Sequence, residues 1–187
     1  MNDDGNGRNH VEWNVLVTAQ EGAARDLKRF IRRLGTFRWS GFRNVLLGQV
    51  TDPDAFLRAL AADIERKPFA QAWLGKVLPI VTTFPVRTEH FLADAESHLT
   101  PMVEELKGKS FHVRVERRGH KGALRTHELE QQIGEYLWQR LENQHAEPAV
   151  AFKDPDVVIA VEIAGTTSGI AVVRRTLREE FPFVKID

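Results

Sequence analysis

The sequence predicts an α/β protein of the α+β kind, in which a ferredoxin-like unit is followed by a second α/β unit. Three observations favour this class. Some stretches alternate apolar and polar residues, which is typical of half-buried strands. Between them lie stretches whose apolar residues recur with helical spacing. The first six elements follow the order β-α-β-β-α-β of a split βαβ unit. The chain has 187 residues, 42% of them hydrophobic, which is enough to bury a core in each unit.

The first helix of the ferredoxin-like unit has an apolar face and a basic face. It follows a strand expected at residues 11–19 and covers residues 22–34. Its apolar residues recur with helical spacing, which places them on the side that faces the core. They are Leu27, Phe30, Ile31 and Leu34. The opposite side carries four cations at the same spacing, Arg25, Lys28, Arg29 and Arg32.

A β-hairpin and a capped helix follow. We expect strands at residues 36–42 and 44–50, joined by a tight turn. Asp52, followed by a proline, predicts the start of a helix over residues 53–66. The carboxylate can accept hydrogen bonds from free N–H groups of the first turn, and a proline there costs no hydrogen bond. A strand at residues 77–84 completes the unit.

The chain is expected to divide into a tail and two domains. Residues 1–10 are polar and glycine-rich and lack the apolar stretch of a signal peptide, so we interpret them as a disordered tail. Pro85 and a change of charge mark the end of the first domain. The predicted domains are therefore residues 11–85 and residues 86–187.

The second unit is expected to place helices on a largely buried sheet. Residues 88–107 have helical spacing, which Pro101 should interrupt. A strand over 110–117 ends in a basic loop, and Thr126 is expected to cap a helix that ends at residue 142. The remainder is β-structure: a short strand at 149–152, a buried strand at 157–164, a hairpin loop at 165–169, a strand at 170–174 and an extended C-terminal segment.

Composition and motifs exclude several classes of protein. The absence of cysteine excludes disulfides, thiolate metal sites and a cysteine nucleophile. The longest apolar run is far shorter than the ~20 residues of a membrane span. His127 and Glu128 begin a zinc-binding H-E-x-x-H motif, but Gln131 replaces the second histidine. We therefore expect a cytoplasmic protein with no membrane contact, no metal, no cofactor and no catalysis of its own.

Positive charge is concentrated in two blocks, although the net charge is zero. Residues 25–43 and residues 107–125 each hold seven cations and one acid. The acids gather instead in residues 86–106 and 126–156. Cations at this density repel one another, so their segregation favours a polyanionic partner such as nucleic acid. We expect the two blocks to form a single surface in the folded chain.

Three segments of the second half resemble the THUMP domain, a module of tRNA-modifying proteins. They are "FHVRVERRGHKG", "ELEQQIGEYLWQRL" after Thr126, and "AVAFKDPDVVIAVEIAGTTSGIAVV". In that family a strand ending in arginines leads into a basic, glycine-containing loop, then a helix, then a DPD turn and a buried strand. The resemblance spans about residues 87–175. It implies an α/β fold, commonly preceded by a ferredoxin-like domain, and binding to the acceptor stem and 3′ end of tRNA.

The resemblance also implies a set of RNA-binding residues. The basic strand end and loop of the family correspond here to Arg114, Arg117, Arg118, Gly119 and Lys121. Further candidates are Arg125, Lys153, Arg174 and Arg175, together with the cations of the first helix, Arg25, Lys28, Arg29 and Arg32. Guanidinium groups suit phosphates because they form forked hydrogen bonds.

The chain is expected to act as an adaptor. It lacks the Asn-Pro-Pro-Tyr and Ser-Gly-Gly-x-Asp-Ser motifs of catalytic domains that accompany THUMP domains. It is thus similar to the stand-alone adaptor that presents tRNA to a separate cytidine acetyltransferase. Two alternatives stay open: a small α/β enzyme that uses carboxylates or histidines between the domains, and an interaction module for an acidic protein. The oligomeric state, the tRNA and the nucleotide are not specified by the sequence.

Overall fold

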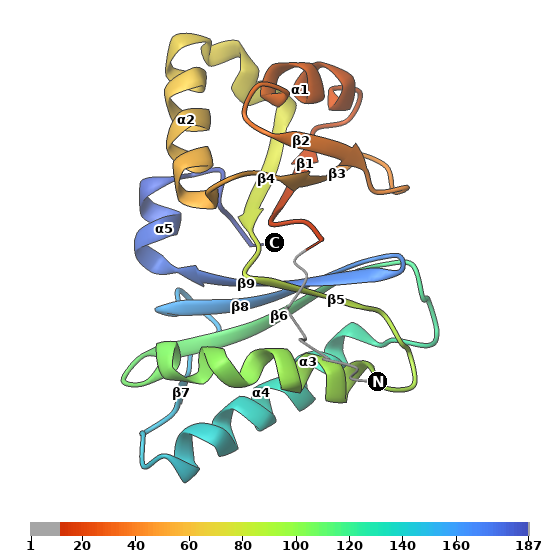
Figure 1. Ribbon diagram of the computed structural model, residues 1–187. Coiled ribbons are helices and arrows are strands. Elements are labelled where there is room, and N and C mark those ends of the chain that lie inside the picture. Colours follow the sequence, from red (N-terminus) through yellow and green to blue (C-terminus); the bar gives the residue numbers. More distant parts are fainter. Residues whose placement is uncertain (1–11, 187) are drawn as a thin grey trace, which may run out of the picture.

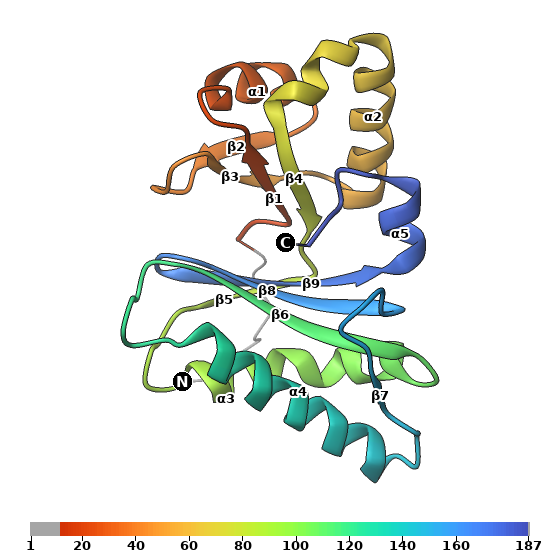
Figure 2. The same cartoon turned by 180° about the vertical axis from the view of Figure 1, so that it is seen from behind.

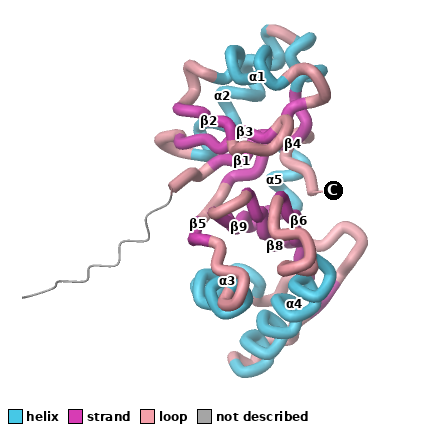
Figure 3. Tube along the Cα trace, turned by 90° about the vertical axis from the view of Figure 1, so that its right-hand side faces the viewer, coloured by secondary structure: helices cyan, strands magenta, loops and turns pink. Residues whose placement is uncertain are grey.

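The computed structural model describes residues 12–186, which form two stacked β-sheets with helices on both outer sides (Figure 1). The helices of the first half lie at one end of the molecule, above the first sheet. The second sheet follows, and the helices of the second half cover its far face, as the turned view also shows (Figure 3). The predicted tail at residues 1–10 lies outside the described residues.

The first sheet has the topology expected of a ferredoxin-like unit. Its strands are β1 (Val15–Ala19), β2 (Thr36–Trp39), β3 (Val45–Gln49) and β4 (Leu74–Pro79). They lie in the order β2-β3-β1-β4, and each neighbouring pair is antiparallel. β3 therefore separates β1 from the parallel strand β2, which makes the unit a split βαβ.

Two helices connect these strands. α1 covers Ala24–Ile31 and α2 covers Pro53–Arg66, and a short 3₁₀ helix, η1 (Pro68–Trp73), leads into β4. The predicted cap is confirmed, because a side-chain oxygen of Asp52 accepts hydrogen bonds from the N–H groups of Asp54 and Ala55. Apolar residues of both helices, among them Leu27, Ile31, Leu57 and Leu60, are buried against the sheet.

The second sheet combines parallel and antiparallel pairs. Its strands are β5 (Thr82–Pro85), β6 (Ser110–Arg118), β7 (Ala149–Val150), β8 (Val157–Ala164) and β9 (Thr167–Arg174), in the order β5-β9-β8-β6-β7. β6 is parallel to β8, whereas β8 and β9 form an antiparallel hairpin. The sheet is covered by α3 (Phe91–Leu99), the 3₁₀ helix η2 (Thr100–Leu106) and α4 (Thr126–Asn143). Pro101 lies in η2, so the predicted interruption of this helix is confirmed.

Three local predictions differ from the structure. The strand expected at residues 77–84 is two strands, β4 and β5, which belong to different sheets. Gly169 lies within β9 and not in a hairpin loop, because Ala164 pairs with Thr167 across a two-residue turn. Thr126 is the first residue of α4 and makes no capping hydrogen bond, since the cap position falls on Arg125.

The two sheets share one hydrophobic core. Side chains of the first sheet pack against Val158 and Ala160 of β8 and against Ala171 and Val173 of β9. After α5 (Arg175–Glu180) the C-terminal segment returns to the first sheet, where the backbone N–H of Val77 donates to the carbonyl of Phe183 at 2.9 Å. The sheets therefore hold each other in a fixed arrangement. The division into domains at residue 85 stays a prediction.

Candidate nucleic-acid interface

The basic loop, residues 119–125, connects β6 to α4 and contains an unusual run of backbone conformations. Gly119, His120 and Gly122 all have positive φ angles, of 95°, 52° and 93°. Nε2 of His120 lies 2.7 Å from the carbonyl oxygen of Gly165, and the N–H of Gly165 donates to the carbonyl of Arg118 at 3.0 Å. The end of β6 is thereby fixed to the turn of the β8–β9 hairpin.

Phe42, next to the first sheet, contacts this loop. It lies in the turn between β2 and β3, which extends over the β8–β9 hairpin (Figure 2). A Cβ atom added to Gly119 would lie 3.4 Å from the Phe42 ring, and one added to Gly165 would lie 3.3 Å from it. Both glycines therefore permit the close approach of the ring. The β2–β3 turn and the basic loop form one continuous edge of the molecule.

Two cations at this end of β6 have no carboxylate partner in the described part of the chain. Lys121, in the loop, is exposed, and no ion pair involves it. Arg117, near the end of β6, is half-buried and donates to the carbonyl of Gly119 in the loop. Its Nε is buried and makes no hydrogen bond to a described residue. The guanidinium group of Arg117 thus supports the loop and keeps its positive charge uncompensated.

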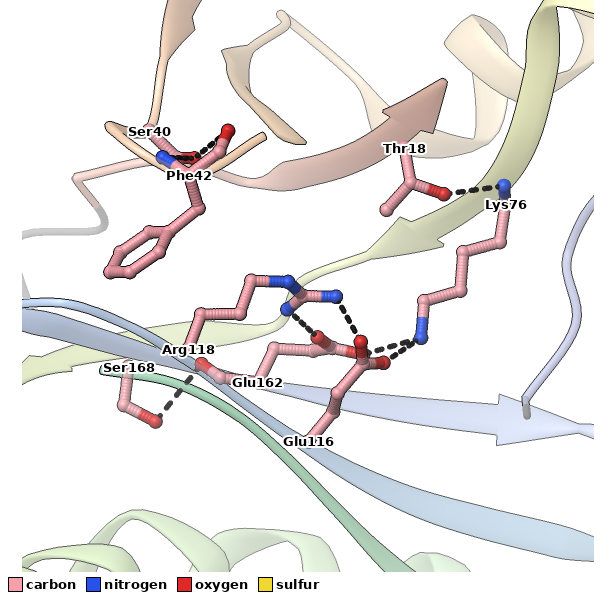
Figure 4. Close-up of polar contacts among 8 residues, drawn as sticks. All are labelled: Thr18, Ser40, Phe42, Lys76, Glu116, Arg118, Glu162 and Ser168. Carbon is pink, nitrogen blue, oxygen red and sulfur yellow. Dashed lines mark hydrogen bonds and ion pairs between the residues drawn. The ribbon is translucent and has the colours of Figure 1, made fainter. Parts of the chain in front are cut away.

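Arg118, by contrast, points into a buried network of four charges between the sheets (Figure 4). Its side chain is 12% exposed and donates to Oε2 of Glu162 at 2.6 Å and to Glu116. Lys76 of β4 lies 3.0 Å from Oε1 of Glu162 and also binds Glu116. RNA could reach the guanidinium group of Arg118 only by displacing these carboxylates.

Mutual pairing favours the charged forms of Lys76 and Glu116. Burial alone would lower the pKa of Lys76, but the carboxylates of Glu162 and Glu116 outweigh it and raise the pKa. Burial would raise the pKa of Glu116, but hydrogen bonding to Lys76 and the charge of Arg118 lower it. Two cations and two anions compensate one another, so the network contributes no net charge to the surface.

The sequence contained a signal for this network. Glu162 is the one charged residue of a strand, "VVIAVEIA", that is buried throughout. A carboxylate in such a strand requires a cationic partner. Its partner Lys76 was missed, because it comes from the other sheet and no local pattern connects the two positions.

The predicted RNA-binding residues of the second half do not lie together. β6 pairs with β8 from Phe111 opposite Val157 to Arg118 opposite Ala164. Seven residue steps separate these pairs, which corresponds to about 23 Å. The basic loop lies beyond one end of this ladder, whereas Lys153, Arg174 and Arg175 lie beyond the other. The structure therefore separates the family-derived candidates into two groups.

Several candidate cations have carboxylate partners. Arg125 lies 2.8 Å from Glu128, and Arg114 lies 3.7 Å from Glu130. Three further pairs lie at the far end of the sheet: Arg174 with Glu105, and Arg175 with both Asp154 and Asp156. These charges are partly compensated in the folded chain. They contribute less positive potential than the exposed Lys121 and Lys153, which form no ion pair within residues 12–186.

The basic face of α1 lies at the end of the molecule remote from α4 (Figure 1). Arg25, Arg29 and Arg32 are exposed on it, and Lys28 lies 4.9 Å from the centre of the Trp39 ring. The expectation that the two basic blocks form one surface therefore fails for the α1 cations, which lie away from the basic loop. Arg43 of the first block lies in the β2–β3 turn beside that loop, but it is paired with Glu21.

Among the histidines and acids of residues 12–186, no three side chains converge as metal ligands. Glu116 and Glu162 line a cavity of about 200 Å³, but the cations of the network occupy their oxygens. No helix in this range is long and apolar enough to cross a membrane.

The family expected from the sequence is found in the second half. Residues 89–173 match the family model of the THUMP domain. This range runs from the turn before α3 to the last residues of β9, and it includes β6 and the basic loop. A search of curated proteins found no match.

Several solved structures share the fold of most of this chain. PH1313 from Pyrococcus horikoshii Ot3 has a TM-score of 0.59 and 15% identity, with 86% of this chain and 54% of that chain covered. TrmN from Thermus thermophilus has a TM-score of 0.60 and 17% identity, with 84% and 44% covered. A 4-thiouridine synthetase, solved with RNA and ATP, has a TM-score of 0.54 and 18% identity, with 87% and 42% covered. The chain thus spans about half of these proteins or less, and the likeness establishes the fold.

Proposed function

We propose that this chain, which contains a THUMP domain at residues 89–173, binds tRNA and presents it to a modifying enzyme. The observation that carries the proposal is the match of the THUMP family to the half of the chain that holds the basic loop. The RNA complex of the structurally similar 4-thiouridine synthetase supports a role of this fold in RNA binding.

The proposed contact lies at the edge formed by the basic loop and Phe42. Lys121 and Arg117 supply uncompensated positive charge there. The Phe42 ring covers Gly119, so the main chain is open to a phosphate at Gly122, where an added Cβ would meet no atom within 4 Å. Phosphate contacts position an RNA without reading its sequence. We therefore expect the chain to recognise the shape of a tRNA end more than its bases.

Binding of tRNA tests the first part of the proposal. A gel-shift series with whole tRNA, tRNA without its 3′ end and duplex DNA should rank whole tRNA first. Lys121→Ala should weaken tRNA binding and reduce the slope of log affinity against log salt by about 1. Arg58→Ala is the matched control, because Arg58 is an exposed cation on α2 without an ion pair in the described residues. Equal affinity for duplex DNA, or equal effects of both substitutions, would contradict the proposal.

We further propose that the modifying enzyme is a separate polypeptide and that the reaction is cytidine acetylation. Mass spectrometry of tRNA nucleosides from cells that lack this gene tests this part. Loss of acetylcytidine supports it, and loss of another modified nucleoside would replace acetylation by that reaction. Unchanged nucleosides would refute the adaptor role, whereas the binding experiment would still stand.

A further inference from the structure

A cavity of about 560 Å³ opens between α1, the C-terminal end of α2 and η1. α1 and α2 lie at the end of the molecule opposite α3 and α4 (Figure 3). The THUMP domain contributes no residue to the cavity, since the lining runs from Asp26 to Trp73. The tRNA contact proposed above therefore does not account for this cavity.

The walls of the cavity carry an excess of positive charge. Five cations line it, Arg29, Arg32, Arg33, Arg66 and Lys67, against the two carboxylates of Asp26 and Asp63. The C-terminal ends of α1 and α2 also lie here, and each contributes roughly half a negative charge. A net charge of about +2 remains after these terms. An anionic ligand would compensate it.

Asp63 holds two of the arginines at the wall. Its side chain is 5% exposed, and its Oδ1 accepts hydrogen bonds from both Arg33 and Arg66. The two arginine side chains remain 59% and 67% exposed. A guanidinium group has five N–H donors. Each arginine therefore keeps donors for a ligand while one carboxylate fixes its position.

The same carboxylate has an unused acceptor. Oδ2 of Asp63 is buried and accepts no hydrogen bond from a described residue. A buried acceptor without a donor is costly, by about 1–3 kcal/mol. The described neighbours of Asp63 therefore do not fully satisfy its carboxylate.

An exposed aromatic ring completes the cavity. Phe69 lies on η1 with 61% of its surface exposed. Its ring meets the edge of Trp73 at 5.2 Å between centroids, and Trp73 in turn meets Phe30 at 6.0 Å. Trp73 and Phe30 thus support Phe69 from one side. A planar base can stack on an exposed ring of this kind.

We propose that this cavity binds a phosphorylated nucleoside. Arg29, Arg32 and Lys67 receive the phosphate, because they line the cavity and form no ion pair in the described residues. Phe69 stacks on the base. The ligand is either a free nucleotide or a nucleotide unit of an unpaired RNA strand, because both present the same phosphate and base.

Fluorescence anisotropy with labelled AMP and with a labelled unstructured RNA of eight nucleotides tests the assignment. Arg29→Ala with Arg32→Ala should weaken binding of the probe at least tenfold, and Phe69→Ala should weaken it about fivefold or more. Arg58→Ala, on α2 but outside the cavity, should change it less than twofold. Thermal unfolding of each variant checks that the fold is kept. We expect little change, because the side chains of Arg29, Arg32, Arg58 and Phe69 are all exposed at the surface.

The two probes distinguish a free nucleotide from a nucleotide unit of an RNA strand as the ligand. Tight binding of AMP assigns a free nucleotide, and binding of the RNA alone assigns a strand. Failure of both probes to bind, or an equal loss with Arg58→Ala, overturns the proposal. Lys121→Ala separates this site from the proposed tRNA contact, because it should leave both small probes unaffected. A loss with Lys121→Ala as large as that with the double substitution would also overturn the proposal.

Discussion

Nζ of Lys76 lies 3.0 Å from Oε1 of Glu162, and each of these side chains is only 3% exposed. Lys76 belongs to the first sheet and Glu162 to the second (Figure 4). The pair therefore connects the two halves of the chain within their shared core. It also explains why Arg118, which lies in a basic block of the sequence, is directed inward.

Removal of Lys76 should strongly destabilise the protein. Lys76→Met leaves Glu162 buried with Arg118 as its remaining partner, and the loss of one member of a buried ion pair costs about 3–5 kcal/mol. Urea denaturation measures this change in the free energy of unfolding. Lys76→Met combined with Glu162→Gln should recover part of the loss, because no unpaired buried charge remains. A loss below about 1 kcal/mol in the single variant would show that the pair is not coupled to folding.

Stability should decline at both extremes of pH. The pKa of Glu116 is lowered, so its stabilising contribution is present above its unfolded value of about 4.3 and disappears as the pH falls through the folded value. The pKa of Lys76 is raised, so its contribution is present below about 10.4 and disappears as the pH rises through the folded value. Denaturation midpoints measured between pH 3 and 11 check both limbs. Glu116→Gln should reduce the loss of stability at acid pH. If the loss is unchanged in this variant, other carboxylates cause it.

Substitution of two glycines should have opposite effects. Gly169→Ala places a Cβ 2.5 Å from the Trp13 ring and 2.9 Å from Ile80, and overpacking of this kind costs about 1–3 kcal/mol. Gly134→Ala lies in α4 with no atom within 4 Å of the new Cβ, and it should stabilise the helix by about 0.5–1 kcal/mol. Thermal unfolding of the two variants measures both changes. Equal shifts would mean that Gly169 is not packed against Trp13 as described.

Substitutions of Arg118 and Lys121 should affect protein stability and tRNA binding differently. Arg118→Ala removes a partner of both Glu116 and Glu162, so it should lower the free energy of unfolding by roughly 3 kcal/mol. Lys121→Ala should leave unfolding within about 0.5 kcal/mol, because Lys121 is exposed and unpaired in the described residues. Denaturation and tRNA binding are measured on the same preparations. Weaker tRNA binding by Arg118→Ala at full stability would show that RNA reaches this arginine.

The cap of α2 should contribute measurably to stability. Asp52→Ala removes the acceptor for the N–H groups of Asp54 and Ala55, which costs about 1 kcal/mol. Asp52→Asn is the control, because asparagine caps nearly as well. Chemical denaturation of the two variants tests the assignment, which requires the alanine variant to be clearly less stable than the asparagine variant.

The sequence by itself determined the local elements and the match of residues 89–173 to the THUMP domain. The order of the first six elements, the range of α2 and the buried strand β8 all follow from short-range patterns of apolar residues, caps and proline. The resemblance to the THUMP domain likewise depended on contiguous segments, and the family match covers them. Such features are encoded within a few residues of one another, so no tertiary information is needed to read them.

Only the tertiary structure decided which positive charges are exposed and free to contact a ligand. The sequence shows Arg117, Arg118 and Lys121 as one cluster, but β6 turns Arg118 toward Glu116 and Glu162 between the sheets and leaves Lys121 in solvent. The fold likewise separates the α1 cations from the basic loop and places Arg29 and Arg32 at the cavity beside η1. Arg33 pairs with Asp63 and Arg118 with Glu162, which lie 30 and 44 residues away in the sequence, and no local pattern of charge specifies such partners.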